Sequence, residues 1–339
     1  MNGLPGISIL IPTLNSERYL EGCLRSIREQ DYPADLVEII AADAGSSDAT
    51  LDLLARYGVD RVVPNPLITA EGARAILNGL ATRELILSID SDTYLVGKDW
   101  LSRMVKPLRD DLSIFASEVI RWDYTPADPP LNRYFALSGI NDPLSLFMGN
   151  YGRFSYMTGK WTEMPHEEEA RVGYFVAKLE PGRVPTMGAN GFLVRTSVLR
   201  SRAGSSSEYY FDIDVVNELV ATGYCRLAKV DVALGHHFAR DLSSLKRKIR
   251  RRVEDFLYWR ERRNYPWLTS GKLPIARFVL YTILVAPLLA QAFRGWTRMH
   301  DRAWLYHVPV CWLTLWLYGR AVLQSAVRRA PHSRRGWQQ

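Results

Sequence analysis

The strongest constraint on the fold is a regular alternation of apolar and amphipathic segments over the first 95 residues. Short apolar runs predict strands, and segments with helical spacing of leucine and isoleucine predict helices. The expected strands are 7–11, 37–42, 62–63 and 85–87, and the expected helices begin near Glu17, Thr50 and Glu71. Such alternation is typical of a parallel sheet covered by helices on both faces. We therefore expect an α/β fold with a Rossmann-like, mostly parallel sheet.

Two carboxylates, Asp90 and Asp92, directly follow the fourth expected strand. Residues i and i+2 of an extended chain point the same way, so both side chains could hold one hard cation. A cation bound by two carboxylates keeps positions open for phosphate oxygens, as Mg²⁺ usually does. Ligands bind at the carboxyl ends of parallel strands, which favours a metal clamp here. A solvated turn is the alternative.

The loop after the first strand limits the kinds of nucleotide that the chain could bind. It reads Pro-Thr-Leu-Asn-Ser-Glu from Pro12 to Glu17, and neither a Gly-x-Gly-x-x-Gly nor a Gly-Lys-Ser/Thr motif is present. Dinucleotide dehydrogenases and P-loop kinases are therefore disfavoured. A diphosphate held through a divalent metal would suit the aspartates without a glycine-rich loop.

Three segments carry a resemblance to a known family. They read ILIPTLNSE at 9–17, SIREQDYP at 26–33 and DAGSSD at 43–48. In order and spacing, roughly the first 95 residues resemble the family 2 glycosyltransferases of GT-A fold. The resemblance implies an inverting transfer of a sugar from a nucleotide-diphosphate sugar, with a bound Mg²⁺ or Mn²⁺.

The same resemblance implies roles for individual residues in the donor half. Asp43 would read the nucleotide base, and Pro12 and Thr13 would line the nucleoside pocket. Many members carry a second Asp where this chain has Ala44, so base contacts would depend more heavily on Asp43. The alternative for Asp43 is an Asx-turn. Further residues in these motifs or at the fourth strand's end complete the expected donor and metal site: Asn15, Glu17, Ser46, Asp90 and Asp92.

A weaker resemblance to the same family follows in the second half of the chain. Residues 188–195 resemble the acceptor-side segment in which a glycine-rich turn leads into a strand, and its candidate substrate-binding residues are Gly188, Asn190 and Gly191. Further on, Asp212 falls on the position of the catalytic base, which would take the acceptor's proton, with Asp214 as the alternative. Either aspartate could instead cap the following helix. Phe211 and Glu218 depart from the family pattern.

A strand at 230–237 resembles the family's late strand, which ends in a histidine that can complete the metal site. Adjacent strand residues point opposite ways, so one of His236 and His237 should face the metal. We expect His237, with an ordinary surface histidine as the alternative. Residues 118–186 are rich in aromatic residues, and four prolines interrupt them at 126, 129, 130 and 143. No motif places this region, and we expect it to cover the acceptor side.

The composition changes near residue 245. Segment 245–263 holds nine Lys or Arg and three acidic residues, a large part of the chain's net charge of +7. Its apolar residues follow helical spacing, which predicts a basic amphipathic helix in the interface of an anionic membrane, with Tyr258, Trp259, Tyr265 and Trp267 at headgroup depth. Nucleic acid would also attract this charge. The apolar segments that follow favour the membrane, and we expect no nucleic-acid partner.

Two apolar segments, 278–293 and 303–317, follow the basic segment. Each is shorter than the ~20 residues that usually span a bilayer. We expect an apolar helical hairpin joined by 295–302, or two helices lying in the interface; a buried helix pair of a soluble protein is the alternative.

The expected division is a catalytic domain at 1–240, an interfacial helix at 241–270 and a membrane-associated hairpin with a basic tail at 271–339. The catalytic domain would comprise a nucleotide-sugar half at 1–95 and an acceptor half at 96–240. The 339 residues contain three scattered cysteines, which favours a reducing compartment. The first apolar run is the first strand, so we expect no signal peptide.

These features predict a glycosyltransferase at the cytosolic membrane face, which uses a lipid-linked or polysaccharide acceptor and could form a homodimer. A nucleotidyltransferase or a catalytically silent binding protein is the alternative.

Overall fold

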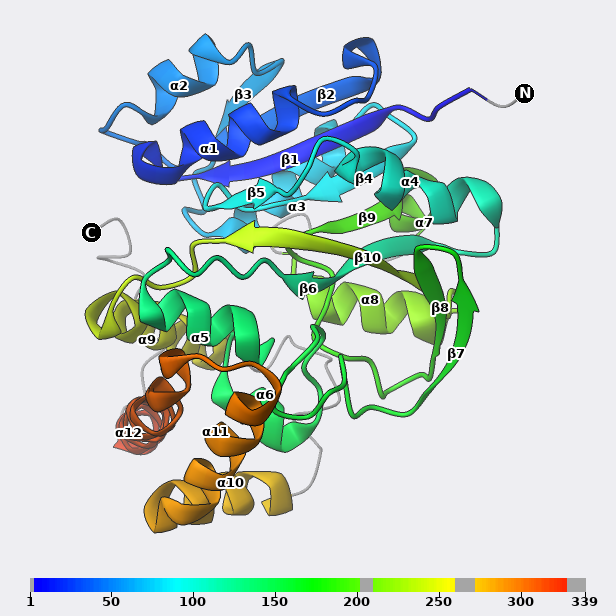
Figure 1. Ribbon diagram of the computed structural model, residues 1–339. Helices are drawn as coiled ribbons and strands as arrows, with labels where there is room; N and C mark the ends of the chain where they lie inside the picture. Colours follow the sequence, from blue (N-terminus) through cyan, green and yellow to red (C-terminus); the bar gives the residue numbers. More distant parts are fainter. Residues whose placement is uncertain (1–2, 202–209, 260–271, 328–339) are drawn as a thin grey trace. The chain divides into compact units, whose positions relative to one another are not determined.

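The computed structural model describes residues 3–201, 210–259 and 272–327. The described chain forms two compact units (Figure 1). The first contains Met1–Asp123 and Met164–His236, and the second contains Tyr124–Glu163 and His237–Gln339. The first unit ends at His236, and we expected the catalytic domain to end at residue 240. However, 124–163, which we expected in the acceptor half of the catalytic domain, groups with the C-terminal helices.

The N-terminal half of the first unit has the predicted alternation. Four parallel strands lie in the order β3-β2-β1-β4. All residues of β1, β2 and β4 are buried, because helices cover the sheet. The elements are β1 (Ile7–Thr13), α1 (Glu17–Arg28), η1 (Ala34–Leu36), β2 (Val37–Asp43), α2 (Thr50–Arg56), β3 (Arg61–Pro64), α3 (Ala70–Leu80) and β4 (Leu85–Ser88).

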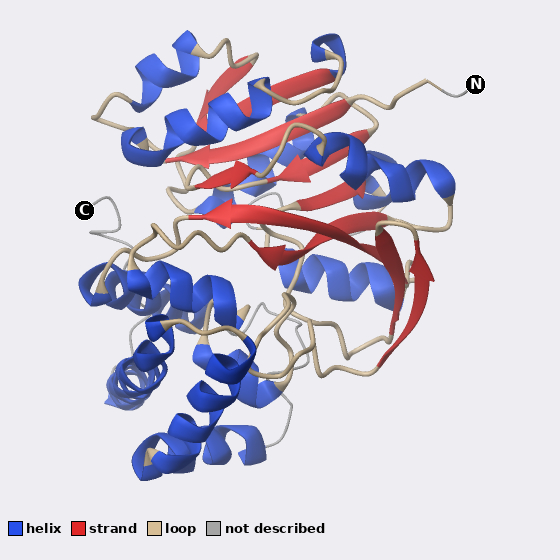
Figure 2. Cartoon of the chain, in the orientation of Figure 1, coloured by secondary structure: helices blue, strands red, loops and turns tan. Residues whose placement is uncertain are grey.

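The C-terminal half of the same sheet is mixed (Figure 2). β9 runs antiparallel to β4 and β6, β6 and β10 are parallel, and β8, β7 and β5 add antiparallel pairings. The sheet is therefore parallel on the N-terminal side and mixed overall. The elements are β5 (Thr93–Leu95), α4 (Trp100–Asp110), β6 (Ala116–Trp122), β7 (His166–Arg171), β8 (Tyr174–Leu179), β9 (Phe192–Arg195), α7 (Thr196–Arg200), α8 (Asp212–Ala221) and β10 (Arg226–His236).

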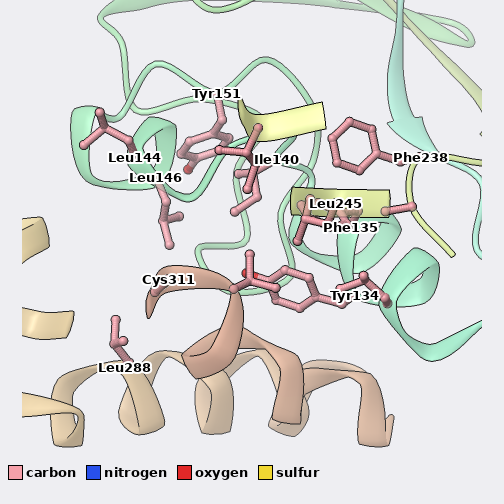
Figure 3. Packing of buried hydrophobic residues seen from close by; sticks show 14 of the residues in the cluster. Tyr134, Phe135, Ile140, Leu144, Leu146, Tyr151, Phe238, Leu245, Leu288 and Cys311 are labelled. Carbon is pink, nitrogen blue, oxygen red and sulfur yellow. The ribbon is translucent and has the colours of Figure 1, made fainter. Parts of the chain in front are cut away.

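The second unit is helical and encloses its own hydrophobic cluster (Figure 3). Tyr134 and Phe135 pack edge to face, with ring centroids 5.1 Å apart, and Phe238 contacts Phe135 at 4.4 Å. The Tyr134 hydroxyl lies 2.8 Å from Nδ1 of the buried His307, which satisfies a polar group inside the cluster. The elements are α5 (Pro130–Ser138), α6 (Pro143–Met148), α9 (Leu242–Trp259), α10 (Lys272–Leu284), α11 (Ala286–Arg298), η3 (Arg302–Tyr306) and α12 (His307–Val327).

Helix α9 corrects the expectation of an interfacial helix. The predicted apolar stripe comprises Leu245, Ile249, Val253, Phe256 and Leu257. The first three are buried in the cluster of the second unit, Leu257 packs against it partly buried, and the helix packs with α12. Protein therefore covers the part of α9 from which we predicted membrane insertion. The expected headgroup residues Tyr265 and Trp267, like the end of the predicted helix at 260–263, lie outside the described residues.

The first expected arm of the hairpin is not one helix. Segment 278–293 is divided between α10 and α11, which are bent by 92° around Val285, a residue with a φ of 61°. Pro287 explains the break, since it has no N–H to donate to the carbonyl of Ile283. Within the described residues, no single helix has the length and apolar composition to cross a membrane, whereas α10 and α11 together meet that test as a bent pair.

Candidate active site

The carboxyl ends of β1 and β2 place Thr13 beside Asp43, as their parallel register requires. Thr13 Oγ1 and Ser46 Oγ donate to Asp43 Oδ1 at 2.9 and 2.6 Å. The backbone N–H groups of Gly45 and Ser46 donate to Oδ2 at 2.9 and 2.8 Å. These four hydrogen bonds use most of the acceptor capacity of the buried carboxylate. Asp43 therefore forms the Asx-turn considered above and shapes the loop at the expected base pocket.

The other expected donor-site residues of the first loop join it to the loop after β2. Asn15, whose φ is 47°, accepts a hydrogen bond from Ser47 N at 2.9 Å and donates its own N–H to Ser46 Oγ at 2.8 Å. Glu17 accepts from Ala49 N at 3.0 Å. Pro12 is buried near the end of β1. Hydrogen bonds thus join the two loops into one rim at the carboxyl end of the sheet.

Asp90 follows β4 and is held from two sides. Arg74 Nη2 donates to its Oδ1 at 2.5 Å, and Asn190 Nδ2 donates to its Oδ2 at 2.7 Å. Asn190 Oδ1 also accepts from the backbone N–H of Asp90 at 2.6 Å. The structure therefore brings the expected donor-site residue Asp90 and the expected acceptor-side residue Asn190 together.

Arg74 is the site residue that sequence reasoning missed. It lies on α3, its side chain is 4% exposed, and it bridges Asp90 and Asp212, with Nη1 3.1 Å from Asp212 Oδ2. Burial lowers the pKa of the guanidinium, but the nearby carboxylates of Asp212, Asp90 and Glu71 outweigh it and raise the net pKa. The available signal was the position of Arg74 three residues before Leu77, on the buried face of α3, because arginine is rarely buried unless it is paired.

Asp212 is the first residue of α8, and Phe211 is the N-cap. Neither Asp212 nor Asp214 is therefore the N-cap residue. Burial raises the pKa of Asp212 to about 7, although Arg74 opposes the shift; Glu71 and Asp90 add to it. Its Oδ1 is buried and, within the described residues, accepts no hydrogen bond. A carboxylate with a pKa near neutrality and an oxygen that accepts no hydrogen bond is suited to take a proton.

The glycine-rich turn before β9 allows this close packing. Gly188 has a φ of 99°, and a Cβ there would lie 2.9 Å from the carbonyl oxygen of Asp212. Its N–H donates to Glu118 Oε1 at 3.2 Å, and Glu118 is itself paired with Lys229 at 2.8 Å. Gly191, with a φ of 71°, donates its N–H to Ser88 O at 2.9 Å and fixes the turn to the end of β4.

Asp92 lies beside a histidine at the end of β10. His236 Nε2 is 3.6 Å from Asp92 Oδ1, and its ring packs on Trp122 with centroids 4.7 Å apart. The antiparallel register of β5 and β10 causes this approach, because it pairs His236 with Thr93, the residue after Asp92. We expected His237 for this role; the geometry favours His236, and His237 belongs to the second unit.

A glycine sets the register that brings His236 to Asp92. Gly235 is paired with Tyr94, and a Cβ on Gly235 would lie 2.1 Å from the Tyr94 ring. The Tyr94 hydroxyl then donates to Asp123 Oδ2 at 3.0 Å. The aromatic ring therefore covers the glycine and fixes β5 against β10.

The donor set suits a divalent cation only in part. Within the described residues, no three His, Cys, Asp or Glu side chains converge on one point. Asp92 and His236 provide one carboxylate and one imidazole, whereas both oxygens of Asp90 already accept hydrogen bonds. This pair fits an ion that takes its remaining ligands from phosphate oxygens and water, as Mg²⁺ and Mn²⁺ do.

Comparison with known proteins finds similar sequences and folds among glycosyltransferases. The family model for "Glycosyl transferase family 2" matches residues 8–181, just over half of the chain. The poly(ribitol-phosphate) beta-glucosyltransferase of Bacillus spizizenii is 38% identical over 103 residues, which are 29% of this chain and 16% of that protein. The poly(ribitol-phosphate) beta-N-acetylglucosaminyltransferase TarS of Staphylococcus aureus is 32% identical over 93 residues, 26% of this chain and 16% of that protein. The chain thus spans 16% of the length of these relatives.

Among solved structures, the mannosyltransferase PcManGT from Pyrobaculum calidifontis, in complex with GDP-Man and Mn²⁺, superposes with a TM-score of 0.54. The match covers 95% of this chain and 88% of that chain at 15% sequence identity. At this identity the likeness concerns the fold, which is the α/β fold of GT-A type.

Proposed function

The chain belongs to glycosyl transferase family 2, and on that premise we propose that it transfers a sugar from a nucleotide-diphosphate sugar to an acceptor hydroxyl. The observation that carries this proposal is the buried bridge from Asp212 through Arg74 to Asp90. It connects a carboxylate suited to proton removal with the strand end at which nucleotides bind in α/β sheets.

The proposed reaction is an inverting displacement at the anomeric carbon. Asp212 takes the proton from the acceptor hydroxyl while the acceptor oxygen forms its bond to that carbon. The bond between the anomeric carbon and the diphosphate oxygen breaks on the opposite face, and its electron pair leaves with the nucleoside diphosphate. The Oδ1 atom of Asp212, which accepts no hydrogen bond within the described residues, and the pKa of about 7 support this role. Asp214, buried on the first turn of the same helix, remains the alternative.

We assign the divalent metal to Asp92 and His236. A bound Mg²⁺ or Mn²⁺ would supply charge stabilisation for the departing diphosphate. The Mn²⁺ in the complex of the mannosyltransferase of similar fold supports a metal, and the carboxylate–imidazole pair supports its place. His237, which we first expected, remains the alternative ligand. Asp90, held by Arg74 and Asn190, would act mainly by keeping the strand end in position.

For the acceptor, we propose a lipid-linked saccharide or a polysaccharide. Two relatives are named for transfer to poly(ribitol-phosphate), a polymeric acceptor, which supports the second class. Work at the cytosolic face of a membrane, where nucleotide sugars are made, would suit the first class. The basic face of α9 is compatible with that location.

A donor screen tests the proposal. The full chain is mixed with Mn²⁺ and each of a set of UDP- and GDP-sugars, and thermal unfolding and slow release of nucleoside diphosphate are recorded. We expect at least one donor to raise the unfolding temperature only when metal is present, since a ligand stabilises the state that it binds. If metal and nucleotide sugars leave the unfolding temperature unchanged and no diphosphate is released, the assignment fails.

A further inference from the structure

The outer face of α10 is apolar although it faces away from the cluster of the second unit. Phe278 and Thr282 are buried, whereas Leu273, Leu280 and Leu284, on the opposite side of the helix, are 79%, 53% and 57% exposed. A helix that is apolar on all sides is normally enclosed by protein or by lipid. Within the described residues, protein encloses only the inner side of α10.

Helices α11 and α12 pack with α10 and with each other (Figure 1). Both also carry exposed apolar residues. Exposed apolar residues on each helix recur at intervals of three, four or seven, so they share one face. On α11 and α12 these residues are Leu289, Phe293, Trp296, Trp312, Trp316 and Leu323. Scattered single apolar residues on a surface are ordinary, but three neighbouring helices with such faces indicate an interaction surface.

Positive charge accompanies these apolar faces. From 272 to 327 the chain has six Lys or Arg and one acidic residue, Asp301, which is bound by Arg133. Arg320 lies over the ring of Trp316 at 5.7 Å, and Lys246 of α9 lies over the same ring at 5.3 Å. Cations beside partly exposed tryptophan are typical of side chains that sit at the boundary between lipid headgroups and acyl chains.

Helix α9 adds charge from the side that its buried stripe leaves outside. Lys246, Arg247, Arg250 and Arg251 are exposed, while Leu245 and Ile249 fix the helix in the cluster. Clustered basic residues are attracted to anionic lipid headgroups. The apolar contact with a membrane, which we expected from the stripe of α9, would therefore come from α10–α12. Helix α9 would contribute only its positive charge.

We propose that the outer faces of α10, α11 and α12, together with the basic face of α9, form a lipid-docking surface for an anionic bilayer. The 92° bend between α10 and α11 suits helices that lie in the interface rather than one straight span. Apolar faces together with excess positive charge favour an anionic bilayer over a second copy of the chain or nucleic acid. A second copy of the chain would bring the same positive charge to the contact and repel it, and nucleic acid would not cover leucine and phenylalanine.

Vesicle binding tests this surface directly. The full chain is floated with vesicles of phosphatidylcholine alone or with phosphatidylglycerol added, in chelator and without nucleotide. We expect binding to the anionic vesicles, and at least tenfold weaker binding for the double variant Leu280→Asp and Phe293→Asp, whose exposed side chains make little contribution to the fold. Arg247→Gln with Arg251→Gln should weaken binding by roughly fivefold per charge and reduce its salt dependence.

The matched control replaces two exposed apolar residues of the first unit by aspartate. Leu112→Asp with Val172→Asp changes two side chains that are 81% and 87% exposed, and it should leave vesicle binding unchanged. Asp92→Asn should also bind vesicles like the wild type, because the docking surface does not need the donor site. The proposal is overturned if the α10–α11 variant binds as tightly as the wild type. It is equally overturned if the wild type does not bind the anionic vesicles. A dimer of the wild type that the α10–α11 variant converts to monomers in light scattering would then assign this surface to a second copy of the chain.

Discussion

At the scale of single residues, Arg74 has the largest consequence for the site. Its buried guanidinium lies between Asp90 and Asp212, so its removal would leave two carboxylates without their shared cation. Breaking a buried ion pair on one side costs about 3–5 kcal/mol. We expect Arg74→Met to lower the free energy of unfolding by that order in urea titrations at pH 7. Arg74→Lys, which keeps the charge, should lose less, and equal losses for both would contradict the bridge.

The raised pKa of Asp212 also predicts how the stability of the fold depends on pH. Its value is about 7 in the folded chain against an ordinary value of 3.8, so between these values the folded state keeps a proton that the unfolded state has lost. Rising pH therefore disfavours folding through this group from about pH 4 to about pH 7. Asp212→Asn removes the titration, so its unfolding temperature relative to the wild type should rise over this window. A constant difference across the window would refute the shift.

The same group predicts a pH–rate profile. As a base Asp212 must be ionised, so kcat/KM should fall about tenfold per pH unit below a pKa of about 7. Among the described residues, the charges that act on this carboxyl group are Arg74, Glu71 and Asp90. Because Arg74 lowers the pKa, Arg74→Met should move the acid limb to higher pH. If the acid limb of the kcat/KM profile does not move in Arg74→Met, a group other than Asp212 causes the pH dependence.

At the scale of secondary-structure elements, the pairing of β5 with β10 positions His236, and Gly235 is its weak point. A methyl group at Gly235 would meet the Tyr94 ring at 2.1 Å, and such overpacking costs about 1–3 kcal/mol. We expect Gly235→Ala to lower the unfolding temperature and weaken Mn²⁺ binding, which calorimetry can measure. Gly22→Ala, inside α1 with open space around it, should be neutral or stabilising. If Gly235→Ala binds Mn²⁺ as tightly as the wild type, His236 is not a ligand of the metal.

Apolar runs and helical spacing were sufficient to predict the four parallel strands and three α-helices of the N-terminal half, whereas the 3-10 helix η1 was not predicted. They could not supply features that depend on residues distant in the sequence. Arg74 is a bridge only because α8 carries Asp212 to α3, and His236 rather than His237 meets Asp92 because of a strand register. The stripe of α9 was read correctly as apolar, but sequence spacing does not say whether protein or lipid covers it.

At the scale of the whole molecule, the C-terminal helices are part of a core as well as a proposed docking surface. Leu288, Trp304 and Val310 are buried in the same cluster as Phe135 and Leu245. Truncation after residue 263 would expose that cluster to water. We therefore expect the truncated chain to aggregate in size-exclusion chromatography instead of yielding a released catalytic domain. A monodisperse, folded product would mean that the second unit does not need these helices.

The most direct test of the proposed transfer compares Asp212→Asn with Asp214→Asn once a donor is known. Turnover and donor affinity are measured in parallel, so that loss of the base is separated from loss of binding. Losing general-base help typically lowers the rate by ~10²–10⁴. We expect this loss for Asp212→Asn with nearly unchanged donor affinity, and a much smaller effect for Asp214→Asn. Normal turnover in Asp212→Asn would contradict the role of Asp212 as the base, whether the activity of Asp214→Asn is lost or kept.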